Sequence, residues 1–114
     1  MIQDKAAKPT RYYSHEQEKR VATSLGGTND LQSGGGKWRK NDVELDEWAL
    51  ECKTKIMPSK TISMHKEWFI DAERNRAESL KSYAAVVFSF GDGKDYYAMD
   101  ERTFKFLLAL SNGE

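Results

Sequence analysis

Two carboxylates and a lysine stand near one another in the stretch from Asp42 to Lys53. If the stretch folds as a hairpin, Asp42 lies opposite Glu51, and Lys53 lies two residues further along the same face. Carboxylate oxygens suit a hard divalent cation, and a lysine beside the cation stabilises negative charge on a phosphate. The stretch therefore predicts a site for metal-dependent phosphodiester hydrolysis, and a nuclease is the leading hypothesis.

The alternation of apolar and polar residues supports this register of the hairpin. A turn at residues 46 and 47 pairs Val43 with Leu50. One face then carries Val43, Leu45, Trp48, Leu50 and Cys52, and the other carries Asp42, Glu44, Ala49, Glu51 and Lys53. The turn lacks the usual glycine, so a loop of odd length with another register stays open. The competing interpretation is a half-solvated amphipathic hairpin whose charges have no chemical role.

The length and composition predict one soluble domain. The chain has 114 residues, enough for a single core, and charged residues make up 32% of it, which is compatible with a globular fold. No apolar run approaches the roughly 20 residues of a membrane span, and no signal peptide is evident. We therefore expect no membrane partner and a cytoplasmic location in a bacterial, archaeal or phage-infected cell. The lone Cys52 has no disulfide partner, and two distant histidines do not favour a zinc site.

The net charge is zero, which at first argues against a nucleic-acid partner. The distribution of charge matters more than its sum, and basic residues flank the hairpin on both sides. Lys37, Arg39 and Lys40 precede the hairpin, and Lys55 follows it. We expect these residues, together with Arg11 from a basic flexible arm at residues 1–13, to hold a DNA backbone. Such binding weakens as the salt concentration rises.

The first helix is expected to begin at Ser14 as N-cap, with Gln17 completing a capping box, and to end near Leu25 before two glycines. Within it, Glu18 lies three and four residues before the apolar Val21 and Ala22, on the same face. A carboxylate on a buried face costs free energy unless it has a partner. We therefore expect Glu18 to reach the polar face of the hairpin. The alternative is a glutamate at the edge of the stripe that extends to water.

The rest of the chain predicts further elements around a small sheet. They are a helix from about residue 63 to 80 that buries Met64, Trp68 and Ala72, strands at 83–90 and 95–99, and a terminal helix capped by Asp100. The terminal helix holds more large apolar residues than one side of a core buries, which suggests a dimer interface. The whole order predicts an α/β fold, with a small central mixed β-sheet flanked by helices, in a single domain over residues 14–114.

Taken together, these residues resemble the PD-(D/E)XK nuclease superfamily, and within it the archaeal-type Holliday-junction resolvases and their phage relatives. The likeness covers about residues 14–90. Four motifs match in order: the helical Glu18 with Val21, the loop Ser33-Gly34, the acidic Asp42, and the tripeptide Glu51-Cys52-Lys53. The residue before Asp42 is Asn41 instead of the proline of the family motif, but that proline is often absent from the family and shapes the backbone, not the chemistry. The resemblance implies a restriction-endonuclease-like core.

The resemblance also implies a metal site and its chemistry. Asp42, Glu51 and the backbone carbonyl of Cys52 would bind Mg²⁺ or Mn²⁺, and Glu18 would reach the ion directly or through water. Lys53 would orient the attacking water or stabilise charge on the phosphate.

Ser33 would touch the scissile region of the DNA. A homodimer would cut a four-way junction in paired strands, recognising branched double-stranded DNA during recombination and repair. The rivals are another nuclease of the superfamily (restriction-like, nicking or flap) and a non-enzymatic DNA-binding or interaction protein.

Overall fold

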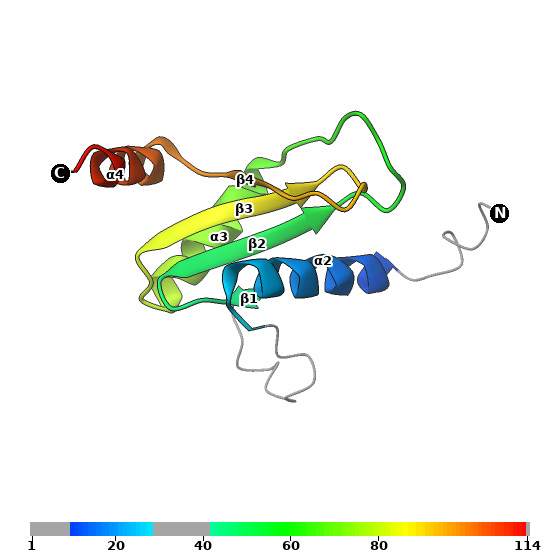
Figure 1. Ribbon diagram of the computed structural model, residues 1–114, viewed down its shortest axis with the longest axis horizontal. Coiled ribbons are helices and arrows are strands. Elements are labelled where there is room, and N and C mark those ends of the chain that lie inside the picture. The colour runs from blue at the N-terminus through cyan, green and yellow to red at the C-terminus, as the bar shows by residue number, and fades with distance from the viewer. Residues whose placement is uncertain (1–9, 29–41, 114) are drawn as a thin grey trace.

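The computed structural model describes residues 10–28 and 42–113 (Figure 1). The elements are α2 (Thr10–Leu25), β1 (Val43–Glu44), β2 (Trp48–Thr54), α3 (Lys66–Glu78), β3 (Tyr83–Ser89), β4 (Tyr96–Ala98) and α4 (Glu101–Ser111). Within these ranges the strands form one four-stranded sheet in the order β1-β2-β3-β4. β2 and β3 are parallel, whereas β1 and β4 are antiparallel to their neighbours. The predicted α/β class with a mixed sheet flanked by helices is confirmed.

The helices α2 and α3 lie on opposite faces of the sheet, α2 in front and α3 behind in Figure 1. α3 connects β2 to β3, because parallel neighbours need a crossover that returns the chain to the same end of the sheet. α2 packs against β1 and β2. The β3–β4 half of the face that carries α2 is therefore less covered within the described part of the chain.

The core lies between α2 and the sheet. Its buried members are Val21, Ala22, Val43, Leu50, Cys52, Ala85 and Val87, with Leu45, Trp48 and Met99 packed against them. Val43 pairs with Leu50, so the predicted register of the hairpin is confirmed. All five residues of its apolar face belong to this cluster, because side chains alternate along a strand and one face must be buried.

The other face of the sheet is covered by α3 and is not simply solvated. Ala49 and Val86 are fully buried there, and Ala72 of α3 is 3% exposed. Glu51 is the register partner of Val86 in the parallel β2–β3 pair, so its side chain projects from the same buried face. The polar face of the hairpin is therefore covered in part by α3 and exposed in part to water.

The first helix begins four residues earlier than predicted. α2 starts at Thr10, and Ser14 lies inside the helix instead of capping it. The sequence carries a start signal at this place too, since Pro9 precedes Thr10 and proline is favoured in the first turn of a helix. Residues 10–13 of the expected flexible arm are thus helical, and residues 1–9 lie outside the described ranges.

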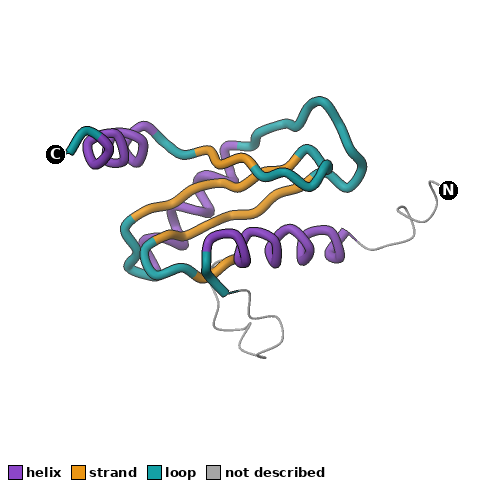
Figure 2. The backbone as a smooth tube through the Cα atoms, viewed as in Figure 1, coloured by secondary structure: helices purple, strands orange, loops and turns teal. Residues whose placement is uncertain are grey.

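The second helix is shorter than predicted. α3 begins at Lys66, with His65 as an N-cap that makes no side-chain capping bond, and ends at Glu78. Met64 precedes the helix and is 41% exposed, so the expectation that it is buried was wrong. Trp68 is half-buried, and Ala72 is buried as expected. A serine at 63 does not cap this helix because the chain is still in the long loop after β2 (Figure 2).

The terminal helix α4 begins as predicted. The Asp100 carboxylate accepts a hydrogen bond from the backbone N–H of Thr103 at 2.9 Å, which is the expected N-cap. α4 stands beyond the end of the sheet and does not lie on either face (Figure 1). Among the described residues, no helix is long and apolar enough to cross a membrane.

Candidate functional site

Glu51 and Lys53 project from β2 toward α3, where they form an ion pair. Lys53 Nζ lies 3.4 Å from Glu51 Oε2, and the Glu51 side chain is 14% exposed. The same Nζ lies 5.5 Å from the ring centroid of Trp68 on α3, within range of a cation–π contact. The lysine is therefore held between a carboxylate and an indole, and it is still 34% exposed.

Asp42 completes the hairpin by a side-chain contact. It lies one residue before β1, and its Oδ2 accepts a hydrogen bond from the backbone N–H of Cys52 at 2.7 Å. The backbone N–H of Asp42 also donates to the carbonyl of Leu50 at 3.4 Å, so the backbone and the side chain of Asp42 both extend the pairing of β1 with β2. Because the N–H and C=O of one strand residue point the same way, the Cys52 carbonyl also faces the Asp42 side. The predicted oxygen ligands of Asp42 and Cys52 are therefore at the same edge of β2.

The two carboxylates of the hairpin lie close enough to repel each other. Burial raises the pKa of Glu51, and the negative charge of Asp42 raises this pKa further, whereas Lys53 lowers it. A cation bound beside both carboxylates would favour the ionised form of Glu51. The donor set of two carboxylates and a carbonyl fits a hard ion such as Mg²⁺ or Mn²⁺.

Cys52 itself points to the core on the α2 side. Burial raises the pKa of its thiol, and the charges of Asp42 and Glu18 raise it further. The thiol therefore stays protonated and packs as a small apolar group, as the sequence predicted. A role for Cys52 at a metal is limited to its backbone carbonyl.

Glu18 belongs to α2, which covers one face of the sheet. Glu51 and Lys53 project from the opposite face, which α3 covers. Val21 and Ala22, which follow Glu18 on α2, are buried against the apolar face of the hairpin. Helix packing alone does not carry Glu18 to the polar face. Within residues 10–28 and 42–113, no three acidic, histidine or cysteine side chains are gathered so that they could hold a metal. A contact of Glu18 with a metal remains a prediction.

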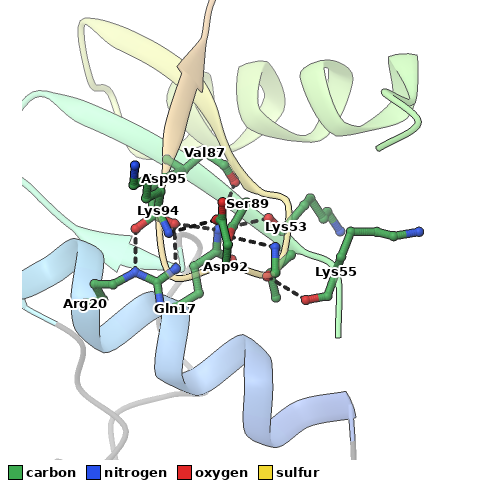
Figure 3. A network of polar contacts seen from close by, with 11 residues as sticks. Gln17, Arg20, Lys53, Lys55, Val87, Ser89, Asp92, Lys94 and Asp95 are labelled. Carbon is green, nitrogen blue, oxygen red and sulfur yellow. Dashed lines mark hydrogen bonds and ion pairs between the residues drawn. The ribbon is translucent and has the colours of Figure 1, made fainter. Parts of the chain in front are cut away.

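Gln17 is the site residue that sequence reasoning missed. It was expected to serve a capping box, yet its side chain is only 1% exposed. Its Nε2 donates to the backbone carbonyl of Lys53 at 2.9 Å and to that of Val87 at 3.4 Å (Figure 3). The amide therefore joins α2 to the ends of the parallel strands β2 and β3. The available signal was its position four residues before Val21, on the buried stripe.

An ion pair lies beside this amide. Gln17 Nε2 also donates to Asp95 Oδ1 at 3.2 Å, and Arg20 binds both oxygens of Asp95, Nε to Oδ2 at 2.7 Å and Nη2 to Oδ1 at 2.8 Å (Figure 3). Asp95 lies one residue before β4. Such a bidentate pair has a fixed geometry. It locks α2 to the start of β4 and thereby fixes the backbone of the Glu-X-Lys segment from the α2 side.

A polar cleft of about 480 Å³ opens beside Lys53. Lys55 and His65 line it together with Trp68, and Ser14 of α2 borders it. Its lining includes the end of β2 and residues of the long loop between β2 and α3, and Figure 2 shows the path of that loop. Cations and hydroxyl groups around a cleft suit the phosphates of a nucleic-acid backbone.

The structure places only part of the predicted DNA-binding set. Lys55 lines the cleft, the position that contact with a DNA backbone would require. Arg11 belongs to the first turn of α2. Ser33, Lys37, Arg39 and Lys40 lie outside the described residues. No protein-family model, curated protein or solved structure matches the chain.

Proposed function

We propose that the chain is a metal-dependent endonuclease that hydrolyses phosphodiester bonds in DNA, built on a restriction-endonuclease-like core. One observation carries the proposal: Lys53 is held 3.4 Å from Glu51 beside a polar, cationic cleft. Asp42 adds a second carboxylate at the edge of the same strand. These groups supply the ligands and the cation that phosphoryl chemistry needs.

In this mechanism Asp42 and Glu51 would hold the metal, together with the backbone carbonyl of Cys52. A divalent ion such as Mg²⁺ or Mn²⁺ would supply Lewis-acid activation of the attacking water and of the phosphate. Lys53 then stabilises the charge that develops on the phosphate oxygens, since its Nζ is partly exposed toward the cleft. The indole of Trp68 and the carboxylate of Glu51 keep the ammonium group in place for this role.

The proposed substrate is branched DNA, cut in paired strands by a homodimer in the manner of a Holliday-junction resolvase. The groups that line the cleft suit phosphates, which favours recognition of shape over sequence. In this proposal Lys55, Arg11 and the basic Lys37, Arg39 and Lys40 hold the backbone, while Ser33 and Glu18 approach the scissile region. The sequence resemblance supports this part of the proposal.

A cleavage assay on a four-way junction tests the proposal. The protein with Mg²⁺ should cut paired strands, and Asp42→Asn or Lys53→Ala should abolish cutting while binding persists. Glu67→Gln is the matched control, because it neutralises an exposed carboxylate on α3 without touching the site. Equal cleavage of a linear duplex would overturn the resolvase assignment and leave the nuclease intact.

A second candidate is a non-enzymatic protein that binds a nucleic-acid backbone. The observation that favours it is that no three potential side-chain ligands are gathered for a metal among the described residues. Calorimetric titration with Mn²⁺ separates the candidates. The nuclease binds the ion stoichiometrically and loses binding in Glu51→Gln, whereas the alternative shows no metal binding and no cleavage.

A further inference from the structure

The helix α4 presents a large apolar surface that the described part of the chain leaves open to solvent. Phe104 is 56% exposed, Phe106 51%, Leu108 45% and Leu110 57%. These side chains are spaced along a single helix that stands beyond the end of the sheet (Figure 1). Helical spacing sets Phe104 and Leu108 on one side of α4, and Phe106 and Leu110 on another. Exposed apolar side chains over so wide an arc of a helix mark an interaction surface in folded proteins.

The start of α4 is nevertheless anchored. Thr103 is 2% exposed, and its N–H is bound by the Asp100 cap. The ring of Phe106 meets the ring of Tyr83 edge to face, with centroids 5.7 Å apart. These contacts fix the direction of the helix. α4 therefore keeps its distal residues, Leu108 and Leu110, away from its own sheet.

A complementary apolar groove lies on the face of the sheet that α2 covers only in part. Its volume is about 460 Å³, within the range of about 300–1,000 Å³ typical of ligand-binding clefts. Leu25 at the end of α2 borders it, and its other apolar walls include Leu45, Trp48, Leu50, Tyr97 and Met99. The groove thus exposes part of the core between α2 and β4.

We propose that α4 of one copy docks in this groove of a second copy, and that the second copy returns the same contact. The charges around the two surfaces are complementary. Asp46 and Glu47 belong to the groove. α4 carries Arg102 and Lys105 against one acidic residue, Glu101, which pairs with Lys105 at 2.7 Å, so the cation that α4 offers to the groove is Arg102. Insertion of a helix with an apolar face into a hydrophobic groove is a common mode of protein recognition.

A second copy is the occupant because one chain carries both halves of the contact. The anchored start of α4 prevents the helix from turning back over its own groove. In a dimer with a two-fold axis, each α4 fills the groove of the other copy. No helix or groove is then left for a third copy. The paired cutting of the proposed function requires a dimer, and this contact would form it. Its readout is molecular mass, so its failure is distinguishable from failure of the nuclease proposal.

Sedimentation analysis of the full chain at several concentrations tests the contact. Wild-type protein should be dimeric. Leu110→Glu on α4 and Leu25→Lys in the groove should each raise the dimer dissociation constant by about tenfold for each of the two contacts. Both positions are exposed in the single chain, so the fold should persist, as circular dichroism would verify. Ile70→Glu is the matched control, since Ile70 is similarly exposed at 47% but lies on α3.

Mixing the two variants makes the test specific. A mixed dimer retains one native contact, and in its other contact the introduced charges have opposite signs. The mixture should therefore form dimers at concentrations at which Leu110→Glu and Leu25→Lys are each monomeric. A monomeric wild type would overturn the inference. So would loss of the dimer in Ile70→Glu, or failure of the mixture to recover it, which would indicate contact of one α4 with the other.

Discussion

The two faces of β2 differ in what covers them and in what their residues do. On one face Leu50 and Cys52 are buried under α2 with a continuous apolar core. On the other face Glu51 and Lys53 lie under α3, paired with each other and beside Trp68. One strand of seven residues therefore serves stability on one side and candidate chemistry on the other.

The difference between the two faces explains why an acidic group beside the core does not carry a large cost in free energy. Alternation places Glu51 between Leu50 and Cys52 in sequence but on the other side of the sheet from them. Glu51 remains 14% exposed, and Lys53 lies beside it, so the charge is neither fully dehydrated nor unpaired. Changes on the two faces should then have separable effects on stability and on metal-dependent activity.

The largest expected effect on stability comes from the α2 face. Leu50→Ala removes a side chain that is 2% exposed in the core, and such changes lower the free energy of unfolding by about 2–5 kcal/mol. Chemical denaturation measures the loss. Lys53 lies three residues further along β2, on the opposite face. If Lys53→Ala lowered the free energy of unfolding as much as Leu50→Ala, the two faces would not differ in their contribution to stability.

A smaller loss is expected from the amide that links α2 to β2. Gln17→Met keeps the size of the side chain but leaves the carbonyls of Lys53 and Val87 without their donor. We expect the free energy of unfolding to fall by about 1–3 kcal/mol, the cost of unpaired buried polar groups. As a positioning residue, Gln17 should also affect the rate of cleavage.

Two further measurements separate positioning from a purely structural role of Gln17. Cleavage by Gln17→Met should slow under conditions in which the variant is fully folded, while its affinity for Mn²⁺ stays that of the wild type. Arg20→Met serves as the control, since it breaks the bond to Asp95 without touching the Lys53 carbonyl. Equal slowing in both variants would show that anchoring of α2 in general, and not this amide, matters.

Local patterns predicted part of this arrangement and missed the rest for a physical reason. Alternation along residues 42–53 gave the hairpin register, and the Asp100 cap was evident because its partner lies three residues away. The role of Gln17 depends on carbonyls 36 and 70 residues distant in the chain. No local pattern specifies such partners. The side from which Glu18 approaches likewise depends on which sheet face α2 buries, which is a tertiary choice.

A further loss, of about 1 kcal/mol, is expected when the N-cap of α4 is removed by Asp100→Ala. Hydrogen bonds from Thr103 lower the pKa of Asp100. The charged groups around it are Arg102 on α4, with Glu73 and Arg76 on α3. Because α4 starts beside α3 and then leaves the sheet, this variant tests how far the α3 side holds the terminal helix.

The pH dependence of this contribution has a definite sign. A carboxylate whose pKa is lowered by folding stabilises the protein above its pKa in the unfolded chain, and this stability is lost as pH falls through the lowered pKa. Thermal unfolding of wild type and Asp100→Ala should therefore differ at neutral pH and converge in acid. A difference that persists in strong acid would mean that the cap acts without its charge.

The smallest effect on stability, with the largest on metal binding, is expected at Glu51. Burial and the charge of Asp42 raise the pKa of Glu51. Folding therefore favours its protonated form, and at neutral pH the ionised group opposes folding. Glu51→Gln removes this penalty but also the ion pair with Lys53. The free energy of unfolding should stay within about 1 kcal/mol of wild type, on the stabilising side, while Mn²⁺ binding is lost. A large destabilisation would mean that the α3 face holds the fold as the α2 face does, and that the contrast between them is wrong.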